Sequence, residues 1–206
     1  MGSTLVPIAI ELGRLDAALG SGDERLLSAV LGRYRGEIEP IDDMAAEFFE
    51  DEDVDGVFTV RDALRQMVMG EEYRRERGLG FVYGYTLHFL CLHLGEELPN
   101  GWWRTTSGWP VKQRVDQALA AAGVAEGVLR TRLLVGRGPP VPLPEIEDYP
   151  SVGYLRVGEA RVALTAVPED GVAAVGDPDI RGALGVLRGW LSACVESGRD
   201  LICFEG

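Results

Sequence analysis

The stretch from Tyr83 to Leu98, YGYTLHFLCLHLGEEL, decides the fold that we expect for this chain. On a helical wheel of about 100° per residue, its large apolar side chains form two stripes on opposite sides. The two stripes are Tyr83, Leu87, Leu90 and Leu94, and Tyr85, Phe89 and Leu92. A helix that is apolar on two faces packs between other elements of a fold. The sequence therefore predicts a central, buried helix over residues 83–94.

Short apolar runs near the two ends of the chain predict strands. Residues 5–10 read LVPIAI, and residues 201–204 read LICF. Because Pro7 cannot donate a backbone hydrogen bond, we expect the first strand at the edge of a sheet, or the proline at the start of the strand. A further short strand is expected at residues 152–155.

Most of the remaining chain has apolar residues at helical spacing. The expected helices lie near residues 12–19, 26–34, 44–49, 64–68, 111–119, 128–135, 159–167 and 179–197. Ser21 and Glu24 have the spacing of a capping box at the start of the second of these. Residues 136–150, GRGPPVPLPEIEDYP, cannot form regular helix or a central strand, since prolines lack the N–H donor and fix φ. We expect an extended strap there.

These elements predict an α+β fold in a single globular domain over residues 1–206. The domain is expected to be predominantly helical around the central buried helix, with a small mixed or antiparallel sheet that includes the terminal strands. With 206 residues, of which 46% are hydrophobic, the chain can bury a substantial core and falls within the usual span of one domain.

Charge and composition narrow the classes of partner. The formal net charge of −13 opposes binding of nucleic acid, which draws its affinity from clustered Lys and Arg. A basic protein or a cation suits such a surface instead. The apolar run at the N-terminus is too short to cross a bilayer, so no membrane is expected as a partner. Three cysteines, Cys91, Cys194 and Cys203, are typical of reduced thiols in a cytoplasmic protein.

The acidic stretch Asp51 to Asp62, DEDVDGVFTVRD, has the spacing of a calcium-binding EF-hand loop. Its candidate oxygen ligands are Asp51, Asp53, Asp55 and Asp62, with Gly56 at the sharp turn. Asp62 is shorter than the usual bidentate Glu, and the sequence has no second loop to pair with this one. The alternative, which we favour, is a hydrated linker that ends in a capping box between Thr59 and Asp62.

His88 and Cys91 share one face of the central helix. A Cys–His pair can make a thiolate nucleophile or half of a zinc site. No further Cys or carboxylate at ligand spacing completes either site, so we favour a buried cysteine beside a hydrogen-bonded histidine. The alternative is an enzyme with a pocket near His88, Cys91 and the loop Trp102–Trp109.

The loop with Trp102, Trp103, Arg104 and Trp109 is the candidate binding site in the sequence. Large aromatic side chains and Arg dominate binding hot spots, so this loop could stack on a ligand or anchor a protein partner. The alternative, which we favour, is that at least two of the three tryptophans fold inward and close the core.

Three segments in this order, YGYTLHFLCLHLGEELPN, VDQALAAAG and GRGPPVPLPEIEDYPSVGYL, resemble an uncharacterised family of small actinobacterial proteins of unknown function, and more loosely the YfbM-like group. The resemblance covers most of the chain, from about Leu12 to Phe204. Its motifs are packing motifs and bring no catalytic residues. The resemblance implies an α+β cytoplasmic protein without an assigned activity.

The function that we expect is a non-catalytic binding or interaction module with an acidic surface. Its partner would be a basic protein, in the manner of proteins that neutralise toxins, and no cofactor is expected. The alternatives are the enzyme with a pocket at His88 and Cys91, and a weak calcium binder through Asp51–Asp62. The sequence leaves the oligomeric state open.

Overall fold

The chain forms two compact units in a computed structural model that describes residues 4–49, 57–76, 78–103, 109–147 and 149–206. The first, which we call the sheet unit, comprises residues 1–12, 95–140 and 151–206. The second, which we call the helical unit, comprises residues 13–94 and 141–150. Each unit is assembled from segments that are far apart in the sequence, and a single domain over residues 1–206 stays a prediction.

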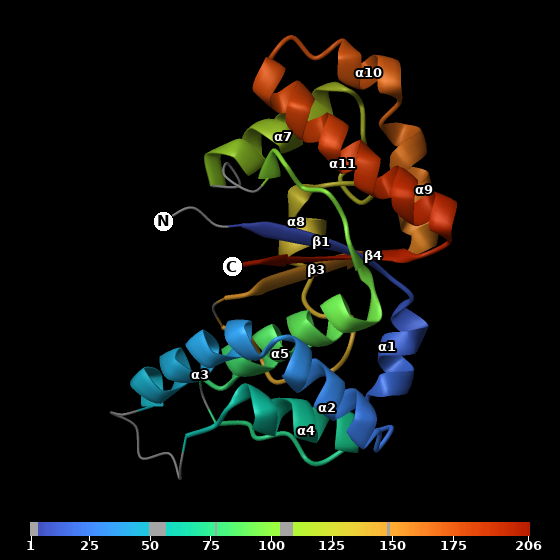
Figure 1. The fold of residues 1–206 in the computed structure, drawn as a ribbon. Helices are drawn as coiled ribbons and strands as arrows, with labels where there is room; N and C mark the ends of the chain where they lie inside the picture. The colour runs from blue at the N-terminus through green and yellow to red at the C-terminus, as the bar shows by residue number, and fades with distance from the viewer. Residues whose placement is uncertain (1–3, 50–56, 77, 104–108, 148) are drawn as a thin grey trace. The chain divides into compact units, whose positions relative to one another are not determined.

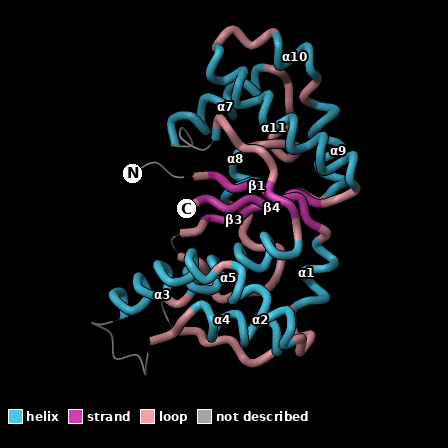
Figure 2. Tube along the Cα trace, viewed as in Figure 1, coloured by secondary structure: helices cyan, strands magenta, loops and turns pink. Residues whose placement is uncertain are grey.

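The sheet unit is built on a sheet of four antiparallel strands in the order β2, β1, β4, β3. Figure 2 labels β1, β4 and β3 of this sheet. The strands are β1 (Leu5–Ile10), β2 (Glu96–Glu97), β3 (Ser151–Leu155) and β4 (Asp200–Glu205). β1 and β4 come from the two ends of the chain and pair from Leu5 opposite Glu205 to Ile10 opposite Asp200. The predicted α+β class, with a small sheet that includes the terminal strands, is confirmed.

The expected edge position of the first strand is wrong, because β1 lies between β2 and β4. Pro7 is tolerated there because β2 is only two residues long and pairs with Ile8 and Ala9 alone. The missing N–H of Pro7 therefore leaves no gap in that ladder. Its carbonyl accepts a hydrogen bond from the N–H of Leu98 at 2.8 Å.

The helices of the sheet unit are α7 (Trp109–Ala121), α8 (Thr131–Val135), α9 (Val157–Ala166), α10 (Glu169–Ala173) and α11 (Pro178–Ser197). The longest of these, α11, is capped at both ends. At the start of α11, the Asp177 carboxylate accepts from the N–H groups of Asp179 and Ile180 at 3.0 and 3.3 Å. The helix ends at Gly198, whose φ of 70° is the left-handed conformation that favours glycine.

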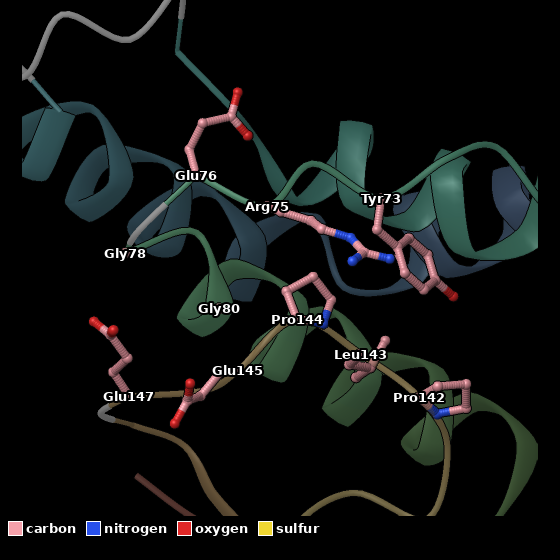
Figure 3. Close-up of a pocket in the computed structure, with 10 residues that line it drawn as sticks. All are labelled: Tyr73, Arg75, Glu76, Gly78, Gly80, Pro142, Leu143, Pro144, Glu145 and Glu147. Atoms are coloured by element: carbon pink, nitrogen blue, oxygen red, sulfur yellow. The ribbon is translucent and has the colours of Figure 1, made fainter.

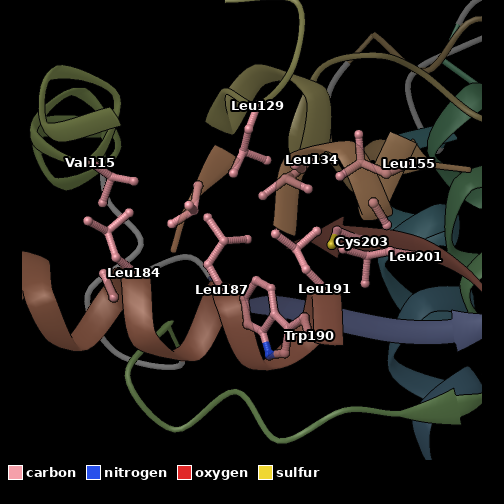
Figure 4. Packing of buried hydrophobic residues seen from close by; sticks show 14 of the residues in the cluster. Val115, Leu129, Leu134, Leu155, Leu184, Leu187, Trp190, Leu191, Leu201 and Cys203 are labelled. Carbon is pink, nitrogen blue, oxygen red and sulfur yellow. The ribbon is translucent and has the colours of Figure 1, made fainter. Parts of the chain in front are cut away.

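The core of the sheet unit gathers side chains from α11 and from the inner strand β4 (Figure 4). Leu187, Trp190 and Leu191 of α11 are at most 1% exposed, and Leu201 and Cys203 of β4 are fully buried. Burial of each of these leucine side chains contributes about 1.5–3 kcal/mol relative to exposure. These contacts join the last helix to the strand that follows it.

The helical unit surrounds one buried helix (Figure 1). Its helices are α1 (Leu12–Ala18), whose first residue belongs to the sheet unit, α2 (Glu24–Arg33), α3 (Arg35–Phe49), α4 (Val60–Met69) and α5 (Gly80–Leu94). Nine of the fifteen residues of α5 are buried, and α2, α3 and α4 pack against it. The predicted buried helix is confirmed, and it begins at Gly80, ahead of Tyr83.

Two local predictions in the helical unit are corrected by the structure. The cap of α2 is Asp23, whose carboxylate accepts from the N–H groups of Arg25 and Leu26 at 2.9 and 3.1 Å. Ser21 instead accepts from the N–H of Asp23 at 3.3 Å, so the expected capping box is wrong. Helix α3 starts well before residue 44 and continues through Pro40. The proline costs one helical hydrogen bond, which the packing of α3 against its neighbours offsets.

The strap, defined here as residues 141–150, packs on α5 through two glycines of that helix. A Cβ at Gly80 would lie 1.8 Å from the backbone oxygen of Glu145. A Cβ at Gly84 would lie 2.8 Å from the ring of Pro150 and 3.1 Å from the side chain of Ile146. Only residues without a side chain allow this close approach. The described residues of the strap have no helix or strand, as the prolines predict.

Among the described residues, no helix combines the length and the apolar composition that a membrane span requires.

Candidate functional site

A groove of about 480 Å³ lies in the helical unit between the chain before α5 and the strap (Figure 3). We call it the strap groove. One wall is formed by Tyr73, Arg75, Glu76, Gly78 and Gly80. The other wall is formed by Pro142, Leu143, Pro144, Glu145 and Glu147. A volume of this size lies within the usual range of ligand sites in proteins.

A network of partly buried polar groups holds the first wall in place. The hydroxyl of Tyr83 donates to the Gln66 side chain and accepts from the N–H of Arg74 at 2.9 Å. The ring of Tyr73 packs edge-on against the ring of Tyr83, with centroids 5.4 Å apart. Burial raises the pKa of Tyr83 to about 12, so this hydroxyl keeps its proton at neutral pH. The part of the wall around Tyr73 is therefore held in place although residues 73–76 have no regular secondary structure.

An ion pair continues this wall toward solvent. The Arg74 guanidinium donates to Glu76 at 2.9 and 2.7 Å and lies 5.3 Å from the centroid of the Phe58 ring. The hydrogen bond from Arg74 lowers the pKa of Glu76 below its ordinary value. The Glu76 carboxylate is thus already occupied by a cation of the chain.

The two ends of the strap groove differ in character. Figure 3 shows the side chain of Arg75 extending toward Tyr73, while Glu145 and Glu147 lie at the opposite end. Arg75, Glu145 and Glu147 are exposed. One end of the groove is therefore acidic, and the other joins an arginine to apolar surface.

The tryptophan loop belongs largely to the core where the structure describes it. Trp103 is 1% exposed, and its indole N–H donates to the carbonyl of Ala183 at 3.2 Å. Trp102 is half-buried and packs edge-on against Trp103, with centroids 5.4 Å apart. Arg104 and the side chain of Trp109 lie outside the described part of the chain. Trp103 is a core residue, and a binding role for the rest of the loop stays a prediction.

Three of the four candidate calcium ligands lie outside the described residues, namely Asp51, Asp53 and Asp55. The fourth, Asp62, belongs to α4. The Asp62 carboxylate accepts from the N–H of Thr59 at 3.0 Å and from its hydroxyl at 2.6 Å, and the N–H of Asp62 donates to that hydroxyl at 3.3 Å. The predicted capping box is confirmed. Calcium binding by this stretch stays a prediction.

His88 and Cys91 have the protonation states of core residues. Burial lowers the pKa of His88 to about 4 and raises the pKa of the fully buried Cys91 thiol well above its usual range. At neutral pH the imidazole is neutral and the thiol protonated, so this pair is not a thiolate–imidazolium nucleophile. Neither side chain lines the strap groove.

Reasoning from the sequence missed the strap groove. Its two walls are separated by about sixty residues, and nothing in the local pattern of residues 73–80 points to the strap. The signal available in the sequence is the pair of glycines, Gly80 and Gly84, because residues without a side chain allow close packing on a helix, but they do not identify the partner segment.

Comparisons with known proteins place the chain in a family. The family model described as "Domain of unknown function (DUF7691)" matches residues 1–205, and the chain belongs to this family. No curated protein and no solved structure gave a match. The expectation of an uncharacterised family is confirmed, whereas the actinobacterial and YfbM-like resemblances stay predictions.

Proposed function

We propose that this member of the DUF7691 family is a non-catalytic binding module whose helical unit captures a basic partner protein. The carrying observation is the unequal distribution of charge between the two units. The helical unit contains nine arginines and twenty Asp and Glu residues, a formal charge of −11. The sheet unit contains eleven basic and thirteen acidic residues, a formal charge of −2.

Internal ion pairs leave this acidic excess in place. In the described residues of the helical unit, Arg35 pairs with Glu39, Arg65 with Glu71, and Arg74 with Glu76. Each pair consumes one charge of either sign, so the excess of eleven carboxylates is unchanged. Such an excess destabilises the unit by self-repulsion and attracts partners of opposite charge. A basic partner, of which a basic toxin is one form, would both relieve the repulsion and associate faster.

The protonation states of Cys91 and His88 support the non-catalytic part of the proposal. A protonated, fully buried thiol beside a neutral imidazole does not act as a nucleophile at neutral pH.

The test uses a defined peptide probe. A fluorescein-labelled peptide of alternating Arg and Gly, and its counterpart with Glu in place of Arg, would be titrated with the protein and followed by fluorescence anisotropy. We expect binding of the Arg peptide alone, weakened at least tenfold between about 0.01 M and 1 M salt as the Debye length falls from about 30 to 3 Å. Failure of the Arg peptide to bind at low salt, or equal binding of both peptides, would refute the proposal.

A further inference from the structure

Helix α3 of the helical unit exposes large apolar side chains to solvent. Met44 is 41% exposed and Phe48 is 52% exposed, and the two residues are one helical turn apart on the same face. The Phe48 ring packs edge-on against the ring of Phe81 in α5, with centroids 5.9 Å apart, so its position is fixed. Methionine and aromatic side chains are enriched in the contact surfaces of proteins that bind other proteins.

The packing of α3 inside the unit does not account for these two side chains. The face of α3 that packs inward contains Ile38, which is 6% exposed, and Ala45, which is fully buried. On a helical wheel of about 100° per residue, Met44 and Phe48 lie about 90° away from that buried face. The exposed face of α3 therefore has apolar anchors that the core of the unit does not cover.

Three carboxylates belong to the same exposed side of α3. They are those of Glu37, Asp43 and Glu47, and none of them has an ion pair or a side-chain hydrogen bond among the described residues. The single basic residue of α3, Arg35, pairs with Glu39 at 3.0 Å on the other side of the helix. With one arginine and five acidic residues, α3 has a formal charge of −4. These three carboxylates are therefore open to a cation from outside the unit.

We infer that the basic partner docks on this exposed face of α3, which we call the α3 face and define by Glu37, Asp43, Met44, Glu47 and Phe48. The partner meets it with an apolar surface bordered by Arg or Lys side chains. Its apolar side chains cover Met44 and Phe48, and its cations bind the three carboxylates.

Charge complementarity names the occupant of the α3 face, since the face has three open carboxylates and no basic side chain. A second copy of this chain fits poorly, because a symmetric contact would bring two helices of formal charge −4 together. This inference rests on the proposed function and names the surface that performs it.

The first experiment removes charges from the α3 face in the full chain and measures binding of the labelled Arg–Gly peptide at low salt. Glu37→Gln with Glu47→Gln removes two carboxylates from the face. Asp16→Asn with Glu72→Gln removes two exposed carboxylates elsewhere in the same unit and is the matched control. Both variants change the net charge equally, so only the position differs. We expect the face variant to bind about fivefold more weakly than the unaltered chain, and the control less than about twofold.

The second experiment tests the apolar anchors. A second labelled peptide keeps the arginines of the Arg–Gly peptide and has Leu in place of every other Gly. The unaltered chain should bind it about fivefold more tightly, because the leucines bury apolar surface against Met44 and Phe48. Met44→Ser should remove most of this gain and leave the affinity for the Arg–Gly peptide unchanged. Val162→Ser, at a 56% exposed position on α9 of the sheet unit, is the matched control and should keep the gain.

The outcomes separate this inference from the proposed function. Absence of binding of the Arg–Gly peptide by the unaltered chain would overturn both. Binding with equal losses in the two charge variants would leave the proposed function standing and overturn the inference alone. The same holds if leucine brings no gain, or if Met44→Ser keeps the gain as Val162→Ser does.

Two further measurements complete the test. Sedimentation of the unaltered chain as a dimer and of the Met44→Ser chain as a monomer would show that a second copy covers the α3 face, and would overturn the inference. If the face charge variant does not fold, as judged by circular dichroism, the comparison of Met44→Ser with Val162→Ser decides.

Discussion

The sheet unit and the helical unit use their charged residues in different ways. Acidic residues of the sheet unit accept hydrogen bonds that stabilise the fold. Asp116 accepts from the N–H and the hydroxyl of Thr131 at 2.8 Å each. Asp200 accepts from the N–H groups of Leu12 and Val157 at 3.0 and 2.8 Å. The unit's acids and bases are nearly equal in number. In the sheet unit, these carboxylates therefore serve to stabilise the fold.

Some acidic residues of the helical unit also accept backbone hydrogen bonds that stabilise the fold. Asp23 caps α2, Asp62 completes the capping box of α4, and Asp42 accepts from the N–H of Val60 at 2.7 Å. The unit has twenty acids against nine arginines, so their number exceeds what ion pairs within the unit require. The comparison shows that almost all of the net negative charge of the chain lies in the helical unit. We therefore assign this charge to binding.

The largest effect is expected at the buried ion pair of the sheet unit. Lys112, the only lysine in the chain, donates to both carboxylate oxygens of Glu205, and both residues are buried. Lys112→Met removes the cation that pairs with the buried Glu205 carboxylate and should lower the free energy of unfolding by about 3–5 kcal/mol. Urea denaturation measures the loss. The double variant with Glu205→Leu should recover most of it, and a double variant as unstable as the single one would show that the pairing is not the cause.

The next largest loss of stability is expected at the contact between the strap and α5. Gly80→Ala places a methyl group against the backbone of Glu145, which cannot move as a flexible side chain could, so we expect a loss of about 1–3 kcal/mol. Gly32→Ala in α2 is the control, because no atom lies within 4 Å of its Cβ position, and it should stabilise the protein by up to about 1 kcal/mol. Thermal unfolding of both variants measures the difference. Equal stabilities would mean that the strap is loosely held.

A pH effect should arise from His88 in α5. Its folded pKa of about 4 lies below the ordinary value of 6.5, so the unfolded chain binds the extra proton first. The contribution of His88 is therefore complete above about pH 6.5 and declines as the pH falls toward 4, by at most about 1.4 kcal/mol per pH unit. His88→Leu should reduce the difference in unfolding free energy between pH 7 and pH 5.

His93 is the control for this measurement, since burial also lowers its pKa. His93→Gln should change the pH dependence less than His88→Leu, because no large shift is expected at its more open position. If the His88 variant keeps the full pH dependence of the unaltered chain, burial of this imidazole does not govern acid stability.

The smallest change in stability is expected when the salt concentration is raised. Raising the ionic strength from about 0.01 to 0.15 M screens like charges, so amides of the helical unit should gain about 0.5 kcal/mol of protection against hydrogen exchange. Amides of β1 and β4 in the nearly neutral sheet unit should change little. Hydrogen exchange followed by mass spectrometry resolves the two units. A uniform gain in both would show that the charge difference has no local consequence.

The sequence by itself determined the features that depend on neighbours along the chain. The two apolar stripes predicted the burial of α5, the terminal apolar runs predicted β1 and β4, and the spacing of Thr59 and Asp62 predicted a cap. The helical period, the strand propensity and the capping bond are local properties, so local residues suffice to predict them.

Only the tertiary structure decided which distant segments meet. It placed the strap on Gly80, paired Lys112 with Glu205, put Trp103 in the core and set β1 inside the sheet. It also divided the chain into units and so gathered eleven of the thirteen excess negative charges in one of them. The physical reason is that packing and charge act through space, where residues about sixty positions apart can be closer than neighbours on opposite faces of one helix.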